Sequence, residues 1–297
     1  MQATPINKLT LLRLIHSIWR LGGLASVERR RQSLPRPYWV SRRLFGGQFL
    51  VDASASLTQS LLYLWGERLV TERRLISTLL APGMHAVDVG ANVGYYLLLL
   101  QQGIGRQGWV TLIEPSEENI PALERNIAIN GYSNVVLHRV AVGENAGRVG
   151  LRTGINSGVT TLDRGAYQVD LRPLDELTDT RVDFLKIDVE RFEGQVLRGA
   201  RRTLEQDRPV LFLELHPELS PRFGHTTSDI IAEVSDLYGG AVEFYRDATR
   251  DLKPLMRLAV RYGLIDPVQQ VVDPLQYMAD LPAGEAGTIW LVAGRRP

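Results

Sequence analysis

Residues 85–96 read His-Ala-Val-Asp-Val-Gly-Ala-Asn-Val-Gly-Tyr-Tyr, and this segment constrains the fold more than any other. A short apolar run ends in Gly90 and Gly94, and a second apolar run with helix-compatible residues follows at once. The pattern predicts a buried strand, a tight turn and a helix. The two glycines allow a sharp turn and let a ligand come close to the backbone. A helix that begins near Asn92 would direct its unpaired N–H groups at the same ligand.

The spacing Asp-x-Gly-x-Asn-x-Gly distinguishes between classes of ligand. Turns that bind dinucleotides read Gly-x-Gly-x-x-Gly, and their backbone closes on a pyrophosphate. In this chain the glycines stand four residues apart, and Asp88 would repel phosphate oxygens. A second apolar run, residues 109–113, ends at Glu114, a position from which an acidic side chain binds ribose hydroxyls. A positively charged nucleoside such as S-adenosyl-L-methionine fits this pattern better than a diphosphate, and an ordinary strand–helix turn is the alternative.

The composition restricts the class of protein. The chain has 297 residues, of which 44% are hydrophobic and 23% charged, and this is typical of a globular protein with one large α/β domain. It has no cysteine, which excludes disulfides, thiolate metal sites and a cysteine nucleophile. No apolar run approaches the roughly 20 residues of a membrane-spanning helix, and we expect a cytoplasmic protein.

The first 50 residues form a basic extension. They carry a charge of +8 in a chain of net charge +1, so residues 51–297 total −7. Apolar residues between positions 9 and 21 recur at helical spacing beside basic ones, which predicts an amphipathic helix. This helix could pack on the domain or on a second copy, lie on a membrane surface, or cover the substrate. We expect no nucleic-acid partner, because no nucleic-acid-binding motif accompanies the arginines. The oligomeric state stays open.

Apolar runs separated by helical stretches predict a mainly parallel sheet with helices on both faces. The predicted strands are 86–89, 109–113, 135–142, 182–187, 210–216, 242–245 and 288–293. Residues 247–285 form a long excursion that prolines interrupt, and such a segment could cap a site. Residues 57–80 predict two helices that part near Gly66, and Glu67 at this break faces either the cofactor or solvent.

Polar side chains stand at the carboxyl ends of the predicted strands, namely Asp88, Glu114, Asp188, Glu190 and His216. Open α/β sheets bind ligands beyond these ends, so the fold would gather the five side chains in one crevice. Methyl transfer from a sulfonium needs an acceptor oxygen in line with the S–CH3 bond and a base for its proton. His216 is the first choice of base because imidazole titrates near neutral pH, with a structural capping role as an equal alternative. Asp188 and Glu190 are the other candidates.

Two further features have structural interpretations. Lys186 lies inside an apolar strand and needs a carboxylate partner, for which Glu214 or Asp188 could serve. Asp188, Glu190 and Glu193 offer the oxygen ligands that magnesium prefers. Acidic residues at the start of a helix are common for electrostatic reasons alone, so we expect no metal.

Six motifs follow one another along the chain. They are Asp-Val-Gly-Ala-Asn-Val-Gly-Tyr from Asp88, Glu114-Pro115, Leu174-Asp175, Leu-Lys-Ile-Asp-Val-Glu up to Glu190, Val-Leu-Arg-Gly-Ala up to Ala200, and Glu-Leu-His up to His216. In this order they resemble the FkbM-type S-adenosylmethionine-dependent methyltransferases. The resemblance implies an α/β fold of the class I methyltransferase, Rossmann-like type, with a seven-stranded sheet whose last strand is antiparallel. It also implies O-methylation of a hydroxyl on a sugar, glycan, polyketide or similar secondary metabolite, with residues 51–297 as the methyltransferase domain.

The resemblance also implies roles for particular residues, with cofactor binding at the glycine motif and an active-site position for Asp188. The candidate cofactor-binding residues are Glu67, Asp88, Gly90, Asn92, Gly94, Tyr95, Glu114, Pro115, Ala141 and Asp188. One departure is that Arg191 stands where the family commonly has glycine, which alters the freedom of the backbone and adds a cation beside the acceptor site. The alternatives are a nicotinamide-dependent oxidoreductase, whose phosphate-binding turn is missing after the first strand, and a protein that binds the cofactor without turnover.

Overall fold

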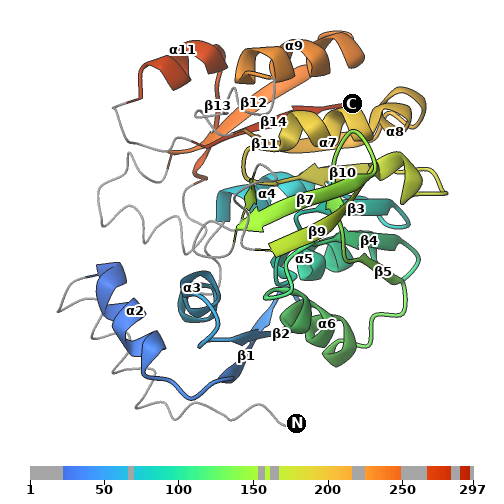
Figure 1. Ribbon diagram of the computed structural model, residues 1–297. Helices are drawn as coiled ribbons and strands as arrows, with labels where there is room; N and C mark the ends of the chain where they lie inside the picture. Colours follow the sequence, from blue (N-terminus) through green and yellow to red (C-terminus); the bar gives the residue numbers. More distant parts are fainter. Residues whose placement is uncertain are drawn as a thin grey trace.

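A computed structural model gives the fold of the chain (Figure 1). It describes residues 23–65, 70–152, 158–160, 167–215, 225–248, 266–281 and 288–294. The expected amphipathic helix at 9–21, Glu67 and His216 lie outside these described residues, as does much of the excursion 247–285. None of the helices in the described ranges is long and apolar enough to cross a lipid bilayer.

The central sheet has eight strands in the order β13-β12-β14-β11-β10-β3-β4-β5. Their bounds are β3 His85–Val89, β4 Trp109–Ile113, β5 Val135–His138, β10 Phe184–Ile187, β11 Val210–Leu215, β12 Val242–Asp247, β13 Val268–Gln270 and β14 Ile289–Ala293. The strands from β11 to β5 are parallel, whereas the last strand, β14, runs antiparallel between β11 and β12. The α/β class and the antiparallel last strand are therefore confirmed, and β13 adds an eighth strand from the excursion near the C-terminus.

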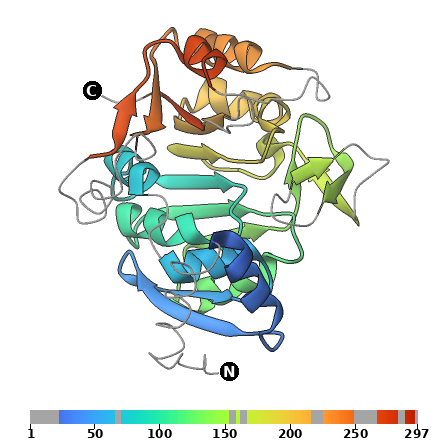
Figure 2. The same ribbon diagram turned by 90° about the vertical axis from the view of Figure 1, so that its left-hand side faces the viewer.

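The predicted strand 135–142 was wrong as one element. The chain leaves the central sheet after β5, and Ala141–Val142 form β6 of a second sheet with the order β6-β9-β7-β8. The other strands of this small sheet are β7 Gly147–Arg152, β8 Gly158–Thr160 and β9 Tyr167–Arg172. Figure 2 shows the small sheet to one side of the central sheet. The apolar run was divided because β6 pairs with β9, a long-range contact that local periodicity does not encode.

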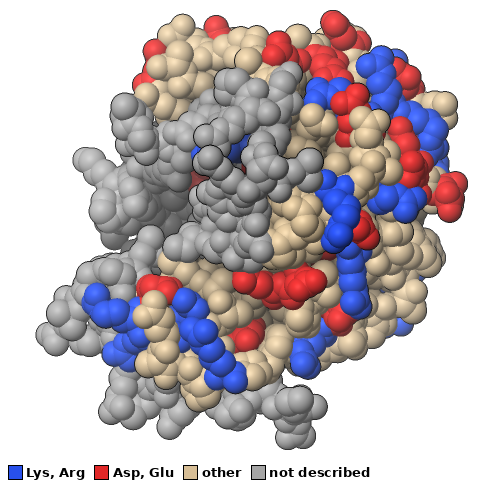
Figure 3. All heavy atoms as spheres, viewed as in Figure 1, with Lys and Arg blue, Asp and Glu red and all other residues tan. Residues whose placement is uncertain are grey.

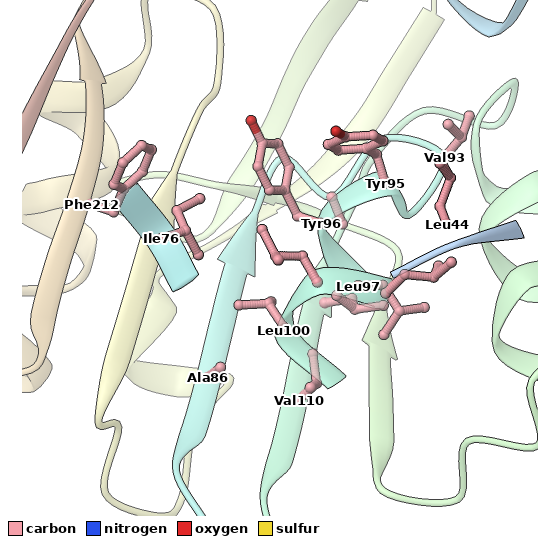
Figure 4. Packing of buried hydrophobic residues seen from close by; sticks show 14 of the residues in the cluster. Leu44, Ile76, Ala86, Val93, Tyr95, Tyr96, Leu97, Leu100, Val110 and Phe212 are labelled. Atoms are coloured by element: carbon pink, nitrogen blue, oxygen red, sulfur yellow. The ribbon is translucent and has the colours of Figure 1, made fainter. Parts of the chain in front are cut away.

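Helices cover both faces of the central sheet. Their bounds are α2 Gly23–Gln32, α3 Leu57–Trp65, α4 Val70–Leu79, α5 Tyr95–Ile104, α6 Ile120–Ile129, α7 Glu193–Gly199, α8 Arg201–Gln206, α9 Thr227–Leu237 and α11 Pro274–Ala279, with a short 3-10 helix at Leu174–Glu176. On one face Leu97 and Leu100 of α5 are buried in the same cluster as Ala86 and Val110 of the strands (Figure 4). On the other face α7, α8 and α9 contribute to a second buried cluster. Two buried faces explain why the parallel strands read as continuous apolar runs.

Part of the basic extension belongs to the folded domain. Strands β1, Trp39–Leu44, and β2, Gly47–Asp52, form an antiparallel hairpin (Figure 2). The side-chain amide of Asn126 on α6 accepts from the Leu50 N–H at 2.6 Å and donates to the Leu50 carbonyl at 2.8 Å. These two hydrogen bonds pair the buried polar groups of Leu50 and Asn126 and attach the hairpin to α6. The expected boundary after residue 50 falls within β2, and Val40, Leu44 and Phe49 of the hairpin are buried in the same cluster as α5.

Basic side chains gather on α2. Arg29, Arg30 and Arg31 occupy its last turn, and Figure 3 shows Lys and Arg spheres over this part of the molecule. Arg31 is paired with Glu28, its Nη2 lying 2.5 Å from Oε1, and its Nη1 donates to the Ser54 carbonyl at 2.7 Å. At least one arginine of this helix therefore holds the extension against the domain.

Candidate active site

Three carboxylates lie at the carboxyl edge of the central sheet because of strand register. Lys186 of β10 stands opposite Asp88 of β3 and Phe212 of β11. Side chains alternate along a strand, so residues two positions further on occupy the same face. Asp188, following β10, and Glu214, within β11, therefore share the face and the edge that Glu114 reaches after β4.

A cavity of about 390 Å³ opens at this edge. Most of the predicted site residues line it, namely Gly90, Asn92, Tyr95, Glu114, Pro115, Ala141, Asp188 and Glu190. Helix α3 and the first turn of α4 supply further walls, with Thr58, Leu62 and Glu72. Two predicted residues, Asp88 and Gly94, do not line the cavity, and Glu67 and His216 lie outside the described residues.

The turn that follows β3 requires glycine at position 90. Gly90 has φ +90°, and a Cβ added there would lie 1.9 Å from the carbonyl oxygen of Asp188. Gly94, with φ +87°, precedes the first residue of α5, which begins at Tyr95 rather than near Asn92. The N–H groups of Gly90 and Ala91 both donate to the Ile113 carbonyl, at 3.0 and 3.1 Å. The turn is thus held against the end of β4 without any side chain in between.

Glu114 connects this turn to the segment that follows β4. Its Oε2 accepts from the Asn92 N–H at 2.7 Å, and its Oε1 accepts from the Ser116 N–H at 2.9 Å and from Asn119 Nδ2 at 3.2 Å. Burial raises the pKa of Glu114, and these hydrogen bonds offset part of the rise. The sequence analysis identified Glu114 but missed its partners Ser116 and Asn119. The sequence indicates these two residues only by their position shortly after Glu114.

Asp88 has a different environment from the one expected. Its side chain is fully buried, and its Oδ1 lies 3.2 Å from Lys186 Nζ. Burial raises the pKa of Asp88, and the charge of Lys186 opposes that rise. The expectation that Asp88 offers its charge to a ligand in the crevice therefore needs correction, because the carboxylate is paired with an internal ammonium group and does not line the cavity.

Lys186 is the cation at the centre of the acidic edge. Its Nζ also lies 3.5 Å from Asp188 Oδ2 and 4.3 Å from the centre of the Tyr96 ring. Burial alone would lower the pKa of Lys186, but the carboxylates of Asp88, Asp188 and Glu214 outweigh burial and raise it. The ammonium group stays charged. The prediction that Lys186 needs a carboxylate partner is confirmed, with Asp188 among those predicted and Asp88 in addition.

Glu72 is a residue of the cavity that sequence reasoning missed. It lies in the first turn of α4 and is only 4% exposed. Burial raises the pKa of Glu72 well above its ordinary value, and the nearby charges of Glu214 and Asp188 raise it further, while Lys186 opposes them. A signal was present, because Glu72 shares the buried face of α4 with Leu75, Ile76 and Leu79 at helical spacing. A glutamate on a buried, apolar helix face is unusual and indicates a partner or a functional role, whereas an exposed glutamate does not.

The segment after Asp188 has an unusual backbone. Glu190, which lines the cavity, has φ +52°, and Arg191 has φ +82°. Both values lie in the left-handed region that favours glycine. The Arg191 N–H donates to Glu193 Oε1 at 3.0 Å. Arg191 thus occupies a conformation in which glycine would be free of strain, and the cation that it would add beside the acceptor site stays a prediction.

The donor set does not point to a metal centre. Within the ranges that the structure describes, no three His, Asp or Glu side chains are arranged to hold a metal ion. The Glu193 side chain is fully buried at the start of α7 and accepts the Arg191 N–H, so it is engaged with the backbone. The cavity therefore offers carboxylates, backbone amides and aromatic rings for the recognition of an organic ligand.

Comparison with known proteins gives one family and several solved structures. Residues 88–239 match the methyltransferase FkbM domain. The methyltransferase FkbM structure from Methylobacillus flagellatus KT is 24% identical, with a TM-score of 0.43 over 63% of this chain and 47% of that one. This chain thus spans about half the length of that protein.

Two other solved structures are similar at lower identity. A SAM-dependent O-methyltransferase from Thermotoga maritima is 16% identical, with a TM-score of 0.39 over 87% of this chain and 78% of that one. A putative methyltransferase from Streptococcus mutans in complex with SAH is 9% identical, with a TM-score of 0.42 over 75% and 95%. Among curated proteins, none matches the sequence.

Proposed function

Since this chain belongs to the FkbM family of methyltransferases, we propose that it is an S-adenosylmethionine-dependent O-methyltransferase. The proposed acceptor is a hydroxyl group of a sugar, a glycan or a secondary metabolite. The observation that carries the proposal is the cavity at the carboxyl edge of the sheet, whose walls include Glu114 and Glu214, with Gly90 and Asp188 at the ends of the two strands between them. Such a cavity has room for a nucleoside beside an acidic surface.

The residues that line the cavity fit the parts of this cofactor. Glu114, at the end of the second strand, is placed to bind ribose hydroxyls, and Ala141 offers an apolar wall to the base. The turn at Gly90 brings bare backbone to the amino-acid part, since no Cβ intervenes. When bound, S-adenosylmethionine supplies a methyl group on a positively charged sulfur. The carboxylate of Asp188 lies on the side of the cavity that would stabilise this positive charge.

The protein's own part in the reaction is positioning and proton removal. The acceptor oxygen must be held in line with the methyl carbon, and its proton must leave. Asp188 and Glu190 line the cavity and are proposed to act there. His216 follows directly after β11 in the chain and stays a proposed base, although it lies outside the described residues.

Calorimetric titration with S-adenosylmethionine and, separately, with NAD tests the cofactor. We expect the first to bind and the second not to bind. Glu114→Gln should weaken S-adenosylmethionine binding at least about tenfold, because it replaces charge-assisted hydrogen bonds from Asn92 and Ser116 with weaker ones. Glu205→Gln, on the exposed side of α8, is the control and should bind normally. Binding of NAD in place of S-adenosylmethionine would reject the proposal.

The acceptor is identified with labelled cofactor. Pooled neutral glycans and secondary metabolites are incubated with the protein and methyl-labelled S-adenosylmethionine, and mass spectrometry searches for products that gain one methyl group. We expect the label on a hydroxyl oxygen. Tight cofactor binding without any labelled product in these pools would favour a protein that binds the cofactor without turnover.

A further inference from the structure

Glu72 is buried in a way that its position in α4 does not require. An acidic side chain in the first turn of a helix interacts favourably with the helix dipole, and it does so without having to be buried. Glu72 is 4% exposed and lines the cavity, and its Oε2 is buried and has no hydrogen-bond partner among the described residues. Leaving such an atom unsatisfied costs free energy, so a group that satisfies it when the cavity is filled is the natural explanation.

A second polar atom in the same cavity has the same property. The hydroxyl of Tyr96 is buried and has no hydrogen-bond partner within the described ranges, while its ring packs on Lys186 Nζ. Figure 4 shows the Tyr96 hydroxyl pointing away from Leu97 and Leu100 of the core. Glu72 and Tyr96 both line the cavity. Two unsatisfied polar groups that line one cavity indicate a ligand that brings hydrogen-bonding atoms to them.

Sheet order decides which end of the cavity this is. The strands run β11-β10-β3-β4, so Glu214 on β11 and Glu114 after β4 are about three strand spacings, or roughly 14 Å, apart. Helix α4, which carries Glu72, packs against β12 and β13 on the β11 side of the sheet, and the carboxylates that act most on Glu72 are Glu214 and Asp188. Glu72 therefore lies at the end opposite Glu114. If ribose is bound at Glu114, as the proposed function requires, the sulfonium and its methyl group extend toward Glu72.

We propose that Glu72 is a catalytic residue that lies against the transferred methyl group and takes the proton from the acceptor hydroxyl, with the Tyr96 hydroxyl as a second hydrogen-bonding group for the acceptor. The inference rests on the proposed function, and it assigns proton removal to Glu72 in place of His216, Asp188 and Glu190. In the step, the acceptor oxygen forms a bond to the methyl carbon, and the C–S bond breaks with its electron pair staying on sulfur. The hydroxyl proton passes to the Glu72 carboxylate and later to water. The acceptor group is thus a hydroxyl, which brings a proton, and not a carboxylate or phosphate, which the acidic wall repels.

The charged groups around Glu72 determine whether its carboxyl group is protonated or ionised. They are Lys186 on β10, Asp188 directly after β10, Glu214 on β11 and Asp247 on β12. With the cavity empty, burial and the surrounding carboxylates favour the protonated form of Glu72, and Lys186 does not outweigh them. A positive charge next to Glu72 favours the ionised form. Entry of a cationic ligand at this end should therefore release the Glu72 proton to solvent and leave a carboxylate facing the acceptor.

Three ligands that differ only at the reacting centre test the placement. S-adenosylmethionine has a sulfonium there, sinefungin has an ammonium-bearing carbon in place of the sulfur and its methyl group, and S-adenosylhomocysteine has a neutral thioether. Affinities and proton release are measured by calorimetry in buffers with different ionisation enthalpies. In the unaltered protein we expect the two cationic ligands to release a proton and S-adenosylhomocysteine to release none.

Glu72→Gln removes the charge but keeps the shape of the side chain. It should abolish this proton release and reduce the preference for sinefungin over S-adenosylhomocysteine at least about tenfold. The affinity for S-adenosylhomocysteine itself should change less than about twofold, because Glu72 does not contact the parts that all three ligands share. Glu205→Gln is the matched control on the exposed side of α8 and should change neither quantity.

The outcomes are distinct. An equal loss of affinity for all three ligands would place Glu72 at the shared amino-acid part and overturn the inference, as would an unchanged preference for sinefungin. If the unaltered protein binds none of the three ligands, the proposed function itself fails.

If Glu72→Gln does not fold, the unaltered protein still gives a test. Its preference for sinefungin should rise from mildly acidic to neutral pH as Glu72 becomes easier to ionise, and a constant preference would reject the inference.

Discussion

Lys186 Nζ lies 3.2 Å from Asp88 Oδ1 in the interior of the sheet, where neither side chain is exposed. The same ammonium group lies 3.5 Å from Asp188 Oδ2 at the wall of the cavity. The ammonium group of Lys186 thus forms ion pairs with a carboxylate of the core, Asp88, and with a carboxylate of the site, Asp188. Stability and site electrostatics are coupled through this residue, since a change at Lys186 alters both.

Lys186→Met should destabilise the protein by about 3 kcal/mol or more, because it leaves Asp88 buried without its partner. The free energy of unfolding is measured by urea titration. Lys186→Met combined with Asp88→Leu is the control and should recover much of the loss, since it removes both charges from the interior. A single variant as stable as the parent would show that the pair contributes nothing.

Gly90→Ala should lose S-adenosylmethionine binding and cost about 3 kcal/mol of stability or more, because the new Cβ would lie 1.9 Å from the Asp188 carbonyl oxygen at a position with φ +90°. Gly83→Ala separates the two causes. Gly83 has φ +84° with no atom near the added Cβ, so its variant should cost only about 1 kcal/mol and leave ligand binding intact. Thermal unfolding and ligand calorimetry compare the two variants, and equal effects would contradict the steric argument.

Arg191→Gly should be more stable than Arg191→Ala by about 1 kcal/mol, because both variants remove the guanidinium group but only glycine relieves the strain of φ +82°. Urea midpoints of the two variants give this difference directly. An alanine variant as stable as the glycine variant would mean that the backbone relaxes at this position without cost.

Glu72→Gln should change how stability depends on pH. The folded state raises the pKa of Glu72 above its ordinary value of 4.5, so the folded protein binds this proton more tightly than the unfolded chain does. The contribution of Glu72 to stability is full below pH 4.5 and is lost as the pH rises through the raised pKa of the folded state.

Glu72→Gln carries no proton to lose, so it should gain stability relative to the parent as the pH rises from mildly acidic to mildly alkaline. Urea midpoints of the two proteins across this range measure the effect. Parallel pH profiles would show that Glu72 titrates normally in the folded state.

Much of the fold follows from local patterns. The strand that ends at Gly90 and the one that ends at Glu114 could be located because apolar runs, glycines and acidic ends are adjacent in sequence. The edge at which the site lies follows from parallel strands alone. Ala141 was placed in the wrong sheet because pairing with Leu171 of β9, thirty residues later, overrode a continuous apolar run.

The sequence by itself determined the α/β architecture, the glycine turn and the meeting of Glu114 and Asp188 at one edge, since each depends on a local period or on strand direction. Only the tertiary structure decided that Lys186 neutralises Asp88, which is 98 residues away, and that Glu72 of α4 enters the cavity. The physical reason is that the energy of a buried charge depends on the partners that strand register and helix packing bring to it, and no short segment contains those partners.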